Sequence, residues 1–236
     1  MTRTNAHGQA VGDPVPGWIP PRPPQPVALE GRYVRLEPLA AGHAPTLFES
    51  LGGDANADLW TYRLDLDPPD TVEETAVMVA HGAVGSDHLT FAVVPLADGV
   101  ARGLTSLYRI DPPNGSIEVG GIVYARSLQR TPASTEATYL LARHLIDELG
   151  YRRFEWKLDS CNEPSAAAAR RLGFTYEGRH RQAIVYKGRN RDTDWFSIVD
   201  TEWPAVRVRI EAWLDPSNFD DDGRQRTSLS AGRQED

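Results

Sequence analysis

One segment of the chain combines residue types that can bind a phosphate group. Thr131 is a favourable N-cap, and Pro132 at the next position suits the first turn of a helix. The first N–H groups of a helix lack partners within the helix and lie at the positive end of its dipole, so anions bind there. The side chains of Arg130, Ser134 and Thr135 could add further donors. The alternative is an ordinary capped helix, because any capped helix shows the same pattern.

A second candidate for chemistry is the carboxylate of Glu118, which lies early in a predicted strand. Its neighbours Ile117 and Val119 are apolar, and burial in apolar surroundings raises the pKa of a carboxylic acid. A carboxylate with a raised pKa can serve as a general base near neutral pH. The alternative is a strand glutamate that faces solvent. Asp159 and His180 are weaker candidates for the same role.

Several other kinds of chemistry find no support in the sequence. The chain has no Gly-x-Ser-x-Gly elbow, P-loop, dinucleotide-binding glycine motif or His-Glu-x-x-His pair, and its six histidines show no metal-ligand spacing. We therefore expect no metal. The single cysteine, Cys161, cannot form an intramolecular disulfide and has no evident activating partner, so a cysteine nucleophile is not expected.

Charge and composition narrow the class of partner. The chain has 236 residues and a net charge of −8, with a pI of about 5.3, and most of that charge lies between the two tails. An acidic protein is a poor generic nucleic-acid binder but attracts cations such as amines. No apolar run approaches the ~20 residues of a membrane span, and no signal peptide is evident. We expect a cytoplasmic protein that binds neither nucleic acid nor membrane.

The elements that would position these residues alternate between strand and helix. Hydrophobic periodicity predicts a first strand at 32–39, helices at 43–52 and 70–84, and a meander of three strands at 90–95, 101–110 and 116–124. The second of these helices has Asp70 as its expected N-cap, with Glu73 three residues further on. The remaining elements are a long helix at 133–149, a strand at 154–158, a helix at 163–172 and closing strands at 174–177, 182–186 and 192–200.

The two termini are predicted to extend from a central domain. Seven of the 18 prolines lie in the first 26 residues, which predicts an extended segment. That segment is either a disordered leader or an arm that packs on the body through Trp18 and Ile19. The last residues are polar and acidic. The predicted divisions are a Pro-rich arm at 1–27, the main domain at 28–204, and a helical extension with an acidic polar tail at 205–236.

Four short motifs stand out in this order of elements: Gln129–Ser134, Asn162–Ser165, Leu172–Gly178 and Gly188–Thr193. Together they resemble the GNAT superfamily of N-acetyltransferases, and in particular its RimJ/RimL-like branch, over about residues 30–203. The resemblance implies an α/β (α+β) fold. The central sheet would be mixed but mostly antiparallel, with about seven strands splayed between the fourth and the fifth, and about four helices would flank it.

The resemblance implies acetyl-CoA as cosubstrate. Family members wrap the pyrophosphate with the pattern Gln/Arg-x-x-Gly-x-Gly/Ala, whereas this chain has Pro132 and Ser134 at the two small positions, which leaves fewer backbone donors. Residues 124–128 would pair with pantetheine in the gap between the splayed strands. The residues expected to hold the cosubstrate are Tyr124, Arg126, Leu128, Gln129, Arg130, Thr131, Ala133, Ser134, Thr135, Asn162 and Ser165.

The resemblance also implies catalytic and acceptor residues. Ser165 matches the serine of the RimJ/RimL-like branch that faces the departing thiolate, whereas the tyrosine of many other members is replaced by Ala169. Glu118 is the expected base, because the glutamate that RimL-like enzymes carry near the sixth strand corresponds to Ile184. The acceptor pocket is expected to be lined by Glu118, Trp60 and Tyr62. The alternatives are a first-turn cap for Ser165 and core packing for Trp60.

The leading hypothesis is an N-acetyltransferase that moves the acetyl group directly to a primary amine of a small molecule or of a protein N-terminus. The family often forms dimers, so a homodimer is one candidate assembly. Two alternatives remain: a non-catalytic domain that binds or senses acyl-CoA, suggested by the altered pyrophosphate motif, and an interaction module that uses the Pro-rich arm as a ligand. Turnover of acetyl-CoA with an amine separates the leading hypothesis from both.

Overall fold

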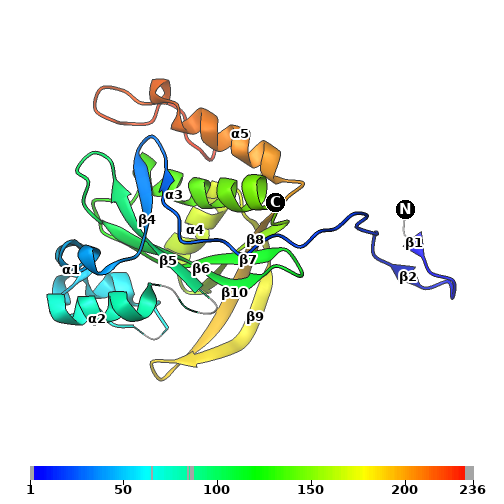
Figure 1. Cartoon of the computed structure of the whole chain (residues 1–236), viewed down its shortest axis with the longest axis horizontal. Coiled ribbons are helices and arrows are strands. Elements are labelled where there is room, and N and C mark those ends of the chain that lie inside the picture. Colours follow the sequence, from blue (N-terminus) through cyan, green and yellow to red (C-terminus); the bar gives the residue numbers. More distant parts are fainter. Residues whose placement is uncertain (1–2, 65, 84, 86–87, 232–236) are drawn as a thin grey trace.

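One central sheet of eight strands organises the computed structural model, which describes residues 3–64, 66–83, 85 and 88–231 (Figure 1). The order across the sheet is β3-β4-β5-β6-β7-β8-β10-β9. The strands are β3 (Leu29–Glu30), β4 (Val34–Pro38), β5 (His88–Pro95), β6 (Gly103–Asp111), β7 (Ser116–Tyr124), β8 (Arg153–Asp159), β9 (Thr175–Tyr186) and β10 (Arg189–Val199). The predicted mixed sheet is confirmed. The short β3 was not predicted, and the strands predicted at 174–177 and 182–186 form the one continuous strand β9.

A split in the sheet lies between β7 and β8. They form the one parallel pair among the described strands, and they are paired only over residues 116–119 and 153–156. Beyond this stretch, residues 120–124 stay paired with β6 and residues 157–159 stay paired with β10. The splay expected between the predicted strands 116–124 and 154–158 is therefore confirmed.

Helices cover both faces of the sheet. They are α1 (Ala44–Leu51), α2 (Val72–Gly82), α3 (Pro132–Ala142), α4 (Glu163–Leu172) and α5 (Trp203–Leu214), five where about four were expected. Phe91 and Val93 of β5 belong to the core shared with α3, α4 and α5, whereas Ala92 and Val94 belong to the core shared with α1 and α2. Successive strand residues point to opposite faces, so a strand covered on both sides is apolar throughout. Residue 84, the predicted end of the second helix, lies outside the described residues.

Side-chain caps fix where two of these helices begin. Thr131 caps α3 as predicted, since its hydroxyl oxygen accepts a hydrogen bond from Ser134 N at 3.2 Å. Thr71 caps α2 in the same way, accepting from Glu74 N at 3.1 Å. The cap predicted at Asp70 is therefore one residue too early. Both residue types cap well, but the Glu74 carboxylate accepts a hydrogen bond from Asp70 N at 2.8 Å, which holds Asp70 just before the helix and leaves Thr71 as the cap.

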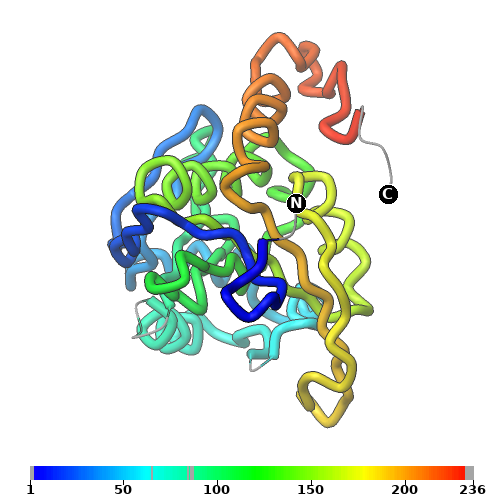
Figure 2. The backbone as a smooth tube through the Cα atoms, turned by 90° about the vertical axis from the view of Figure 1, so that its right-hand side faces the viewer, coloured from blue at the N-terminus to red at the C-terminus, as the bar shows by residue number. Residues whose placement is uncertain are grey.

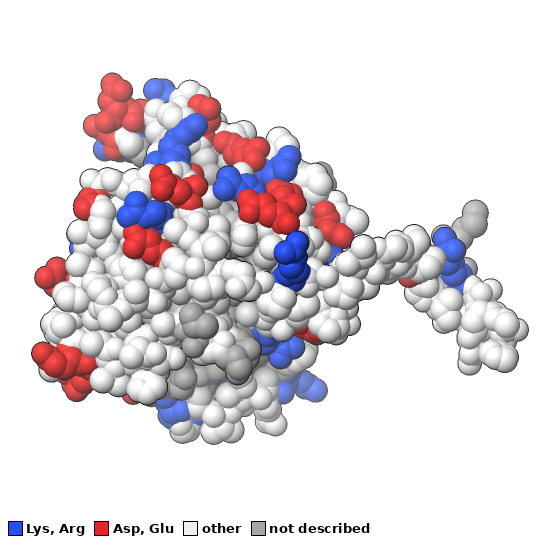
Figure 3. Space-filling view, in the orientation of Figure 1, with Lys and Arg blue, Asp and Glu red and all other residues white. Residues whose placement is uncertain are grey.

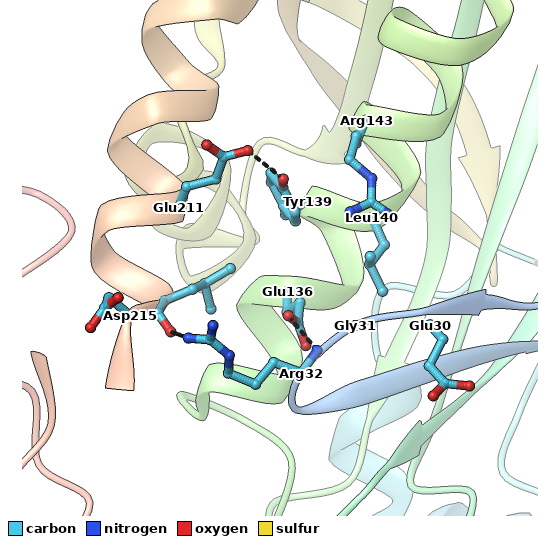
Figure 4. A pocket seen from close by; sticks show the side chains of 10 residues that line it. Glu30, Gly31, Arg32, Glu136, Tyr139, Leu140, Arg143, Glu211 and Asp215 are labelled. Carbon is cyan, nitrogen blue, oxygen red and sulfur yellow. Dashed lines mark hydrogen bonds between the residues drawn. The ribbon is translucent and has the colours of Figure 1, made fainter. Parts of the chain in front are cut away.

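A buried carboxylate ties the edge of the sheet to α3 (Figure 4). Glu136 is 5% exposed, and it accepts hydrogen bonds from the backbone N–H groups of Arg32, Tyr33 and Val34 at 2.9, 2.6 and 3.1 Å. A Cβ atom at Gly31 would overlap this carboxylate, so only glycine fits there. The link fixes the first turns of α3 against β3 and β4.

The N-terminal arm leaves the body and ends in a small hairpin of β1 (Arg3–Thr4) and β2 (Ala10–Val11) (Figure 1). Of the two residues predicted to pack on the body, Trp18 does so: its Nε1 donates to Pro113 O at 3.1 Å. Ile19 does not, since it is 80% exposed. The arm alternative is therefore correct for one contact, near the turn between β6 and β7.

The C-terminal segment folds back on the domain after α5 (Figure 2). Leu229 is 2% exposed, and its carbonyl accepts a hydrogen bond from Arg209 Nη1 at 2.6 Å. Trp213 Nε1 donates to Gln225 Oε1 at 2.9 Å. The prediction of a polar tail thus misses a docked segment. The predicted limits of arm, domain and extension stay predictions. None of the described helices combines the length and apolarity needed to cross a bilayer.

Candidate active site

A cleft of about 1650 Å³ opens where β7 and β8 separate. Its walls come from β7, β8, β10, the first turns of α3 and α4, the segment before α2, and residues 223–225 after α5. Ser134 and Ser165 line it from the face covered by α3 and α4, and Glu118 and Lys157 line it from the other face. The cleft therefore runs through the gap in the sheet.

Eight of the residues predicted to form the site line this one cleft: Tyr62, Glu118, Tyr124, Gln129, Arg130, Ser134, Asn162 and Ser165. A hydrogen bond from the Tyr62 hydroxyl to Cys161 O, at 2.9 Å, brings the segment before α2 against the turn before α4. Side chains more than 100 residues apart in the sequence thus share one cavity because the split in the sheet collects them.

The other predicted site residues lie outside the lining. Trp60 is 1% exposed and its Nε1 donates to Leu51 O at 2.8 Å, so it is a core residue and its assignment to the acceptor pocket is wrong. Arg126 pairs with Asp58 at 2.6 Å on the surface. Local packing and hydrogen bonds occupy the side chains of the remaining four, which are Leu128, Thr131, Ala133 and Thr135.

Neighbouring side chains orient the hydroxyl group of Ser165. Trp156 Nε1 donates a hydrogen bond to Ser165 Oγ at 3.0 Å. Since the oxygen accepts this bond, the hydroxyl proton is available for another partner. Asn162 Oδ1 accepts from Ser165 N at 3.2 Å, so Asn162 is the cap of α4 and Ser165 is not. The amide nitrogen of Asn162 remains a donor toward the cleft.

Glu118 is buried beside a lysine. Its side chain is 13% exposed, so the solvent-facing alternative is wrong, and its Oε2 lies 2.8 Å from Lys157 Nζ. The same ammonium lies 3.1 Å from Glu155 Oε2. Burial raises the pKa of Glu118, as its apolar neighbours predict, while the charge and the hydrogen bond of Lys157 oppose that rise.

Strand register gathers these charges on one face of the sheet. Glu118 stands opposite Glu155 across β7 and β8, and Lys157 stands opposite Trp195 across β8 and β10. Lys157 Nζ lies 3.7 Å from the centroid of the Trp195 ring, a cation–π contact. Arg109, with a φ of 48°, brings its Nε to 3.8 Å from Glu118 Oε2. Arg153 Nε also lies 2.7 Å from Glu155 Oε1, so three cations compensate the acidic pair.

The first turn of α3 offers fewer donors than its sequence predicts. Ser134 N is used by the Thr131 cap, and Ser134 Oγ donates to Thr131 O at 2.8 Å. Thr135 Oγ1 accepts a hydrogen bond from Arg171 Nη1 at 3.1 Å. The guanidinium groups that line this end of the cleft belong to Arg130, Arg171 and Arg224. An anion at this end would therefore rest more on guanidinium charge than on hydroxyl groups.

Several charged lining residues were not predicted from the sequence: Arg109, Lys157, Arg171, Arg191 and Arg224. One signal was available for Lys157, which lies between the apolar residues Trp156 and Leu158 and so must point to the opposite face of β8. Across the described part of the chain, no group of three or more His, Cys, Asp or Glu side chains is arranged to hold a metal ion.

Comparison with known proteins identifies a family and solved structures that this chain resembles. Residues 34–175 match the family model described as Acetyltransferase (GNAT) domain. The crystal structure of a GCN5-related N-acetyltransferase from Brucella melitensis is 43% identical with a TM-score of 0.89, and the match covers 92% of this chain and 98% of that one. A GNAT-family acetyltransferase structure from Chromobacterium violaceum ATCC 12472 is 36% identical with a TM-score of 0.76, covering 83% of this chain and 98% of that one.

A curated relative and one liganded structure add to this. YdaF of Bacillus subtilis (strain 168), provisionally named a ribosomal N-acetyltransferase, is 30% identical over 112 residues, which are 48% of this chain and 61% of YdaF. The chain thus matches less than two thirds of that relative's length. The microcin C7 self-immunity acetyltransferase MccE, solved with acetyl-CoA and AMP, shares the fold at 20% identity and a TM-score of 0.63, covering 72% of this chain and 93% of MccE.

The family match spans more than half of the chain, and the likeness to the Brucella structure extends over nearly its whole length. The likeness to YdaF agrees with the branch that the sequence motifs indicated. This chain therefore belongs to the GNAT family of acetyltransferases.

Proposed function

We propose that this enzyme binds acetyl-CoA in the cleft between β7 and β8 and transfers the acetyl group directly to a primary amine. The acceptor would be a small molecule or a protein N-terminus. The observation that carries the proposal is a buried carboxylate, Glu118, and an oriented hydroxyl, Ser165, which open into one cleft from opposite faces of the sheet.

The cleft fits an elongated ligand with an anionic end. Acetyl-CoA, when bound, supplies the acetyl thioester. Residues 120–124 present backbone groups that β8 leaves unpaired, and Asn162 adds a side-chain amide donor for an extended arm. At the far end, Arg130, Arg171 and Arg224 provide positive charge suited to phosphate groups. The aromatic side chains of Trp213 and Phe219 form part of the same wall.

Glu118 would act as the general base. An amine attacks only when neutral, and it carries a proton at pH 7 because its pKa lies near ~8 for an α-amine and ~10.4 for lysine. The raised pKa of Glu118 brings its basicity closer to that of the amine, which favours proton transfer. Lys157 holds the carboxylate in place, and its charge favours the ionised form against the effect of burial.

Ser165 would act on the leaving group from the other face. Trp156 binds the oxygen of Ser165, so the hydroxyl proton points elsewhere and can be given to a departing thiolate. The new bond forms between the acetyl carbon and the amine nitrogen. The bond to sulfur breaks, the amine proton goes to Glu118, and the sulfur takes the Ser165 proton and leaves as a thiol. Glu118 then gives its proton to solvent and Ser165 regains one from solvent, which returns both groups to their starting states.

The direct test is release of the CoA thiol from acetyl-CoA in the presence of an amine library. The library should include peptides with free N-termini, because the name of YdaF points to ribosomal proteins as acceptors for that relative. Saturable thiol release with one class of amine is expected. Tight binding of acetyl-CoA by calorimetry without release by any amine would instead indicate a sensing domain.

Replacement of the proposed base is the sharpest single change. Glu118→Gln should lower kcat about a hundredfold, within the range typical of a lost general base, and should change the KM for acetyl-CoA little. The matched control is Glu49→Gln, because Glu49 is exposed on α1. Equal kcat values for the two variants would remove Glu118 from the mechanism.

A further inference from the structure

Among the described residues, four arginines that line the cleft form no ion pair: Arg63, Arg130, Arg171 and Arg191. Arg130 and Arg171 lie at the end proposed for the phosphates of acetyl-CoA, so Arg63 and Arg191 are the two without an assigned ligand. Arg191 is 8% exposed. In the part of the chain that the structure describes, its only side-chain hydrogen bond runs from Nε to Thr193 Oγ1 at 3.2 Å, and it forms no ion pair. Arg63 forms no ion pair there either, and its Nε is buried without a hydrogen-bond partner. Both residues line the cleft.

The carboxylates nearest to Arg191 are engaged elsewhere. Asp159 accepts a hydrogen bond from Cys161 N at 2.9 Å and another from the Tyr186 hydroxyl at 2.8 Å. Glu118 is bonded to Lys157. Burial lowers the pKa of Arg191, and the charges of Asp159, Tyr186 and Glu118 partly oppose this. The Arg191 guanidinium group therefore interacts electrostatically with Asp159, Tyr186 and Glu118 but forms no ion pair with any of them.

The position of Arg191 assigns it to the acceptor side of the cleft. Side chains alternate along β10, so Arg191, Thr193 and Trp195 share one face. On that face Trp195 stands beside Lys157, the partner of Glu118. The guanidinium groups proposed for the phosphates of acetyl-CoA, by contrast, lie at the first turn of α3 and in the C-terminal segment.

We propose that the amine acceptor carries an anionic group, a carboxylate or a phosphate, and that Arg191, assisted by Arg63, binds that group in the cleft. This inference rests on the proposed acetyl transfer and names the class of its acceptor. A buried cation without a partner is costly, and an anion supplied by the ligand removes that cost. The binding would be charge-assisted and suited to two oxygen atoms at once.

The charge that lines the acceptor side of the cleft differs from the net charge of the whole chain. Acidic side chains gather in patches on the outer surface (Figure 3). The acceptor side of the cleft is different, because four cations line it, Arg63, Arg109, Lys157 and Arg191. The carboxylates of the lining are three, Asp58, Glu118 and Asp159, and Asp58 is paired with Arg126. The negative net charge of the chain therefore does not select a purely cationic acceptor.

The kinetic test compares amines that differ by one anionic group. Glycine against glycinamide tests a carboxylate, and phosphoethanolamine against ethanolamine tests a phosphate. The wild-type preference in kcat/KM for the anionic member of a pair should fall about tenfold to a hundredfold in Arg191→Gln, and Arg191→Lys should restore part of it. Intrinsic amine reactivity cancels, because each pair is measured in every protein. Arg189→Gln, at an exposed position of the same strand, should keep the wild-type preference.

The preference for the anionic member of each amine pair tests the anion site separately from acetyl transfer. Turnover of both members with a preference that Arg191→Gln leaves unchanged would overturn the anion site while sustaining acetyl transfer. A binding measurement covers the case in which no amine is turned over. Inorganic phosphate, added at saturating CoA so that the cosubstrate end is filled, should raise the melting temperature of the wild type and of Arg189→Gln but not of Arg191→Gln.

Stability separates an anion site from a structural role. Without any anion, Arg191→Gln should melt at or above the wild-type temperature, because it removes an uncompensated buried charge. A clear drop in melting temperature, together with an unchanged phosphate response, would show that Arg191 supports the fold and does not bind an acceptor anion.

Discussion

At the scale of single residues, two opposing effects act on the pKa of the candidate base, Glu118. Burial raises the pKa of Glu118, and Lys157 counters it through its charge and a hydrogen bond of 2.8 Å. In a folded protein, a raised carboxyl pKa makes stability fall as pH rises from the unfolded pKa through the folded one, since the native state binds the extra proton. The site therefore sacrifices some stability near neutral pH to keep a usable base.

Removing the lysine should move the pH profile. In Lys157→Met, burial and repulsion from Glu155 still raise the pKa of Glu118, and only the charge of Arg109 still lowers it, so the pKa rises further. The acidic limb of kcat/KM against pH should then shift to higher pH, because the base stays protonated longer. The control is Lys187→Met, which changes the chain's other lysine at an exposed position. An acidic limb that stays in place would mean that Glu118 is not the group whose titration limits the reaction.

Sequence could predict the surroundings of Glu118 but not its partners. Its apolar neighbours indicated burial and a raised pKa. Lys157 and Arg191 lie 39 and 73 residues away along the chain, and a lysine or arginine on a half-buried strand usually faces solvent. Only the register of β7, β8 and β10 brings them to the same face of the sheet.

At the scale of elements, the attachment of α3 to the sheet edge is the most specific contact. Three backbone N–H groups converge on the Glu136 carboxylate. Because α3 begins at one wall of the cleft, this attachment also sets the position of Ser134 relative to β7. The Thr131 cap and the Asn162 cap were predictable from local sequence, whereas the shift from Asp70 to Thr71 depends on where Glu74 can reach.

Glu136→Gln should lower the free energy of unfolding by about 2 kcal/mol, because charge-assisted hydrogen bonds become neutral ones and one oxygen acceptor is lost. Chemical denaturation gives this value directly. Glu30→Gln is the matched control, since Glu30 is an exposed carboxylate of the same pocket (Figure 4). Equal free energies of unfolding for the two variants would argue that the three N–H groups find other acceptors.

At the scale of the whole molecule, the segment after α5 belongs to the cleft. Phe219, Gly223, Arg224 and Gln225 line the same cavity as Ser134 and Arg171. Composition predicted a polar tail because its few apolar residues, such as Phe219 and Leu229, are widely spaced and form no periodic pattern. The family model matches residues 34–175, which do not include this segment.

Truncation after residue 215 should raise the KM for acetyl-CoA about tenfold, equivalent to ~1.4 kcal/mol, and leave the KM for the amine unchanged. S-acetylpantetheine, which lacks the nucleotide, should be used equally well by both forms. Deletion of residues 1–16, which precede the Trp18 contact, is the control and should alter neither constant. An unchanged KM for acetyl-CoA after the C-terminal truncation would mean that the segment only covers the core.

The split between β7 and β8 also divides the sheet into two blocks. Strands β3 to β7 form one antiparallel block and β8, β10 and β9 form another, joined in the sheet by four residue pairs. Such a short junction is the natural place for local unfolding, in which the blocks loosen before either melts. A ligand that spans the gap would contact both blocks and hold them together. Binding of the cosubstrate would therefore stabilise the sheet against local unfolding.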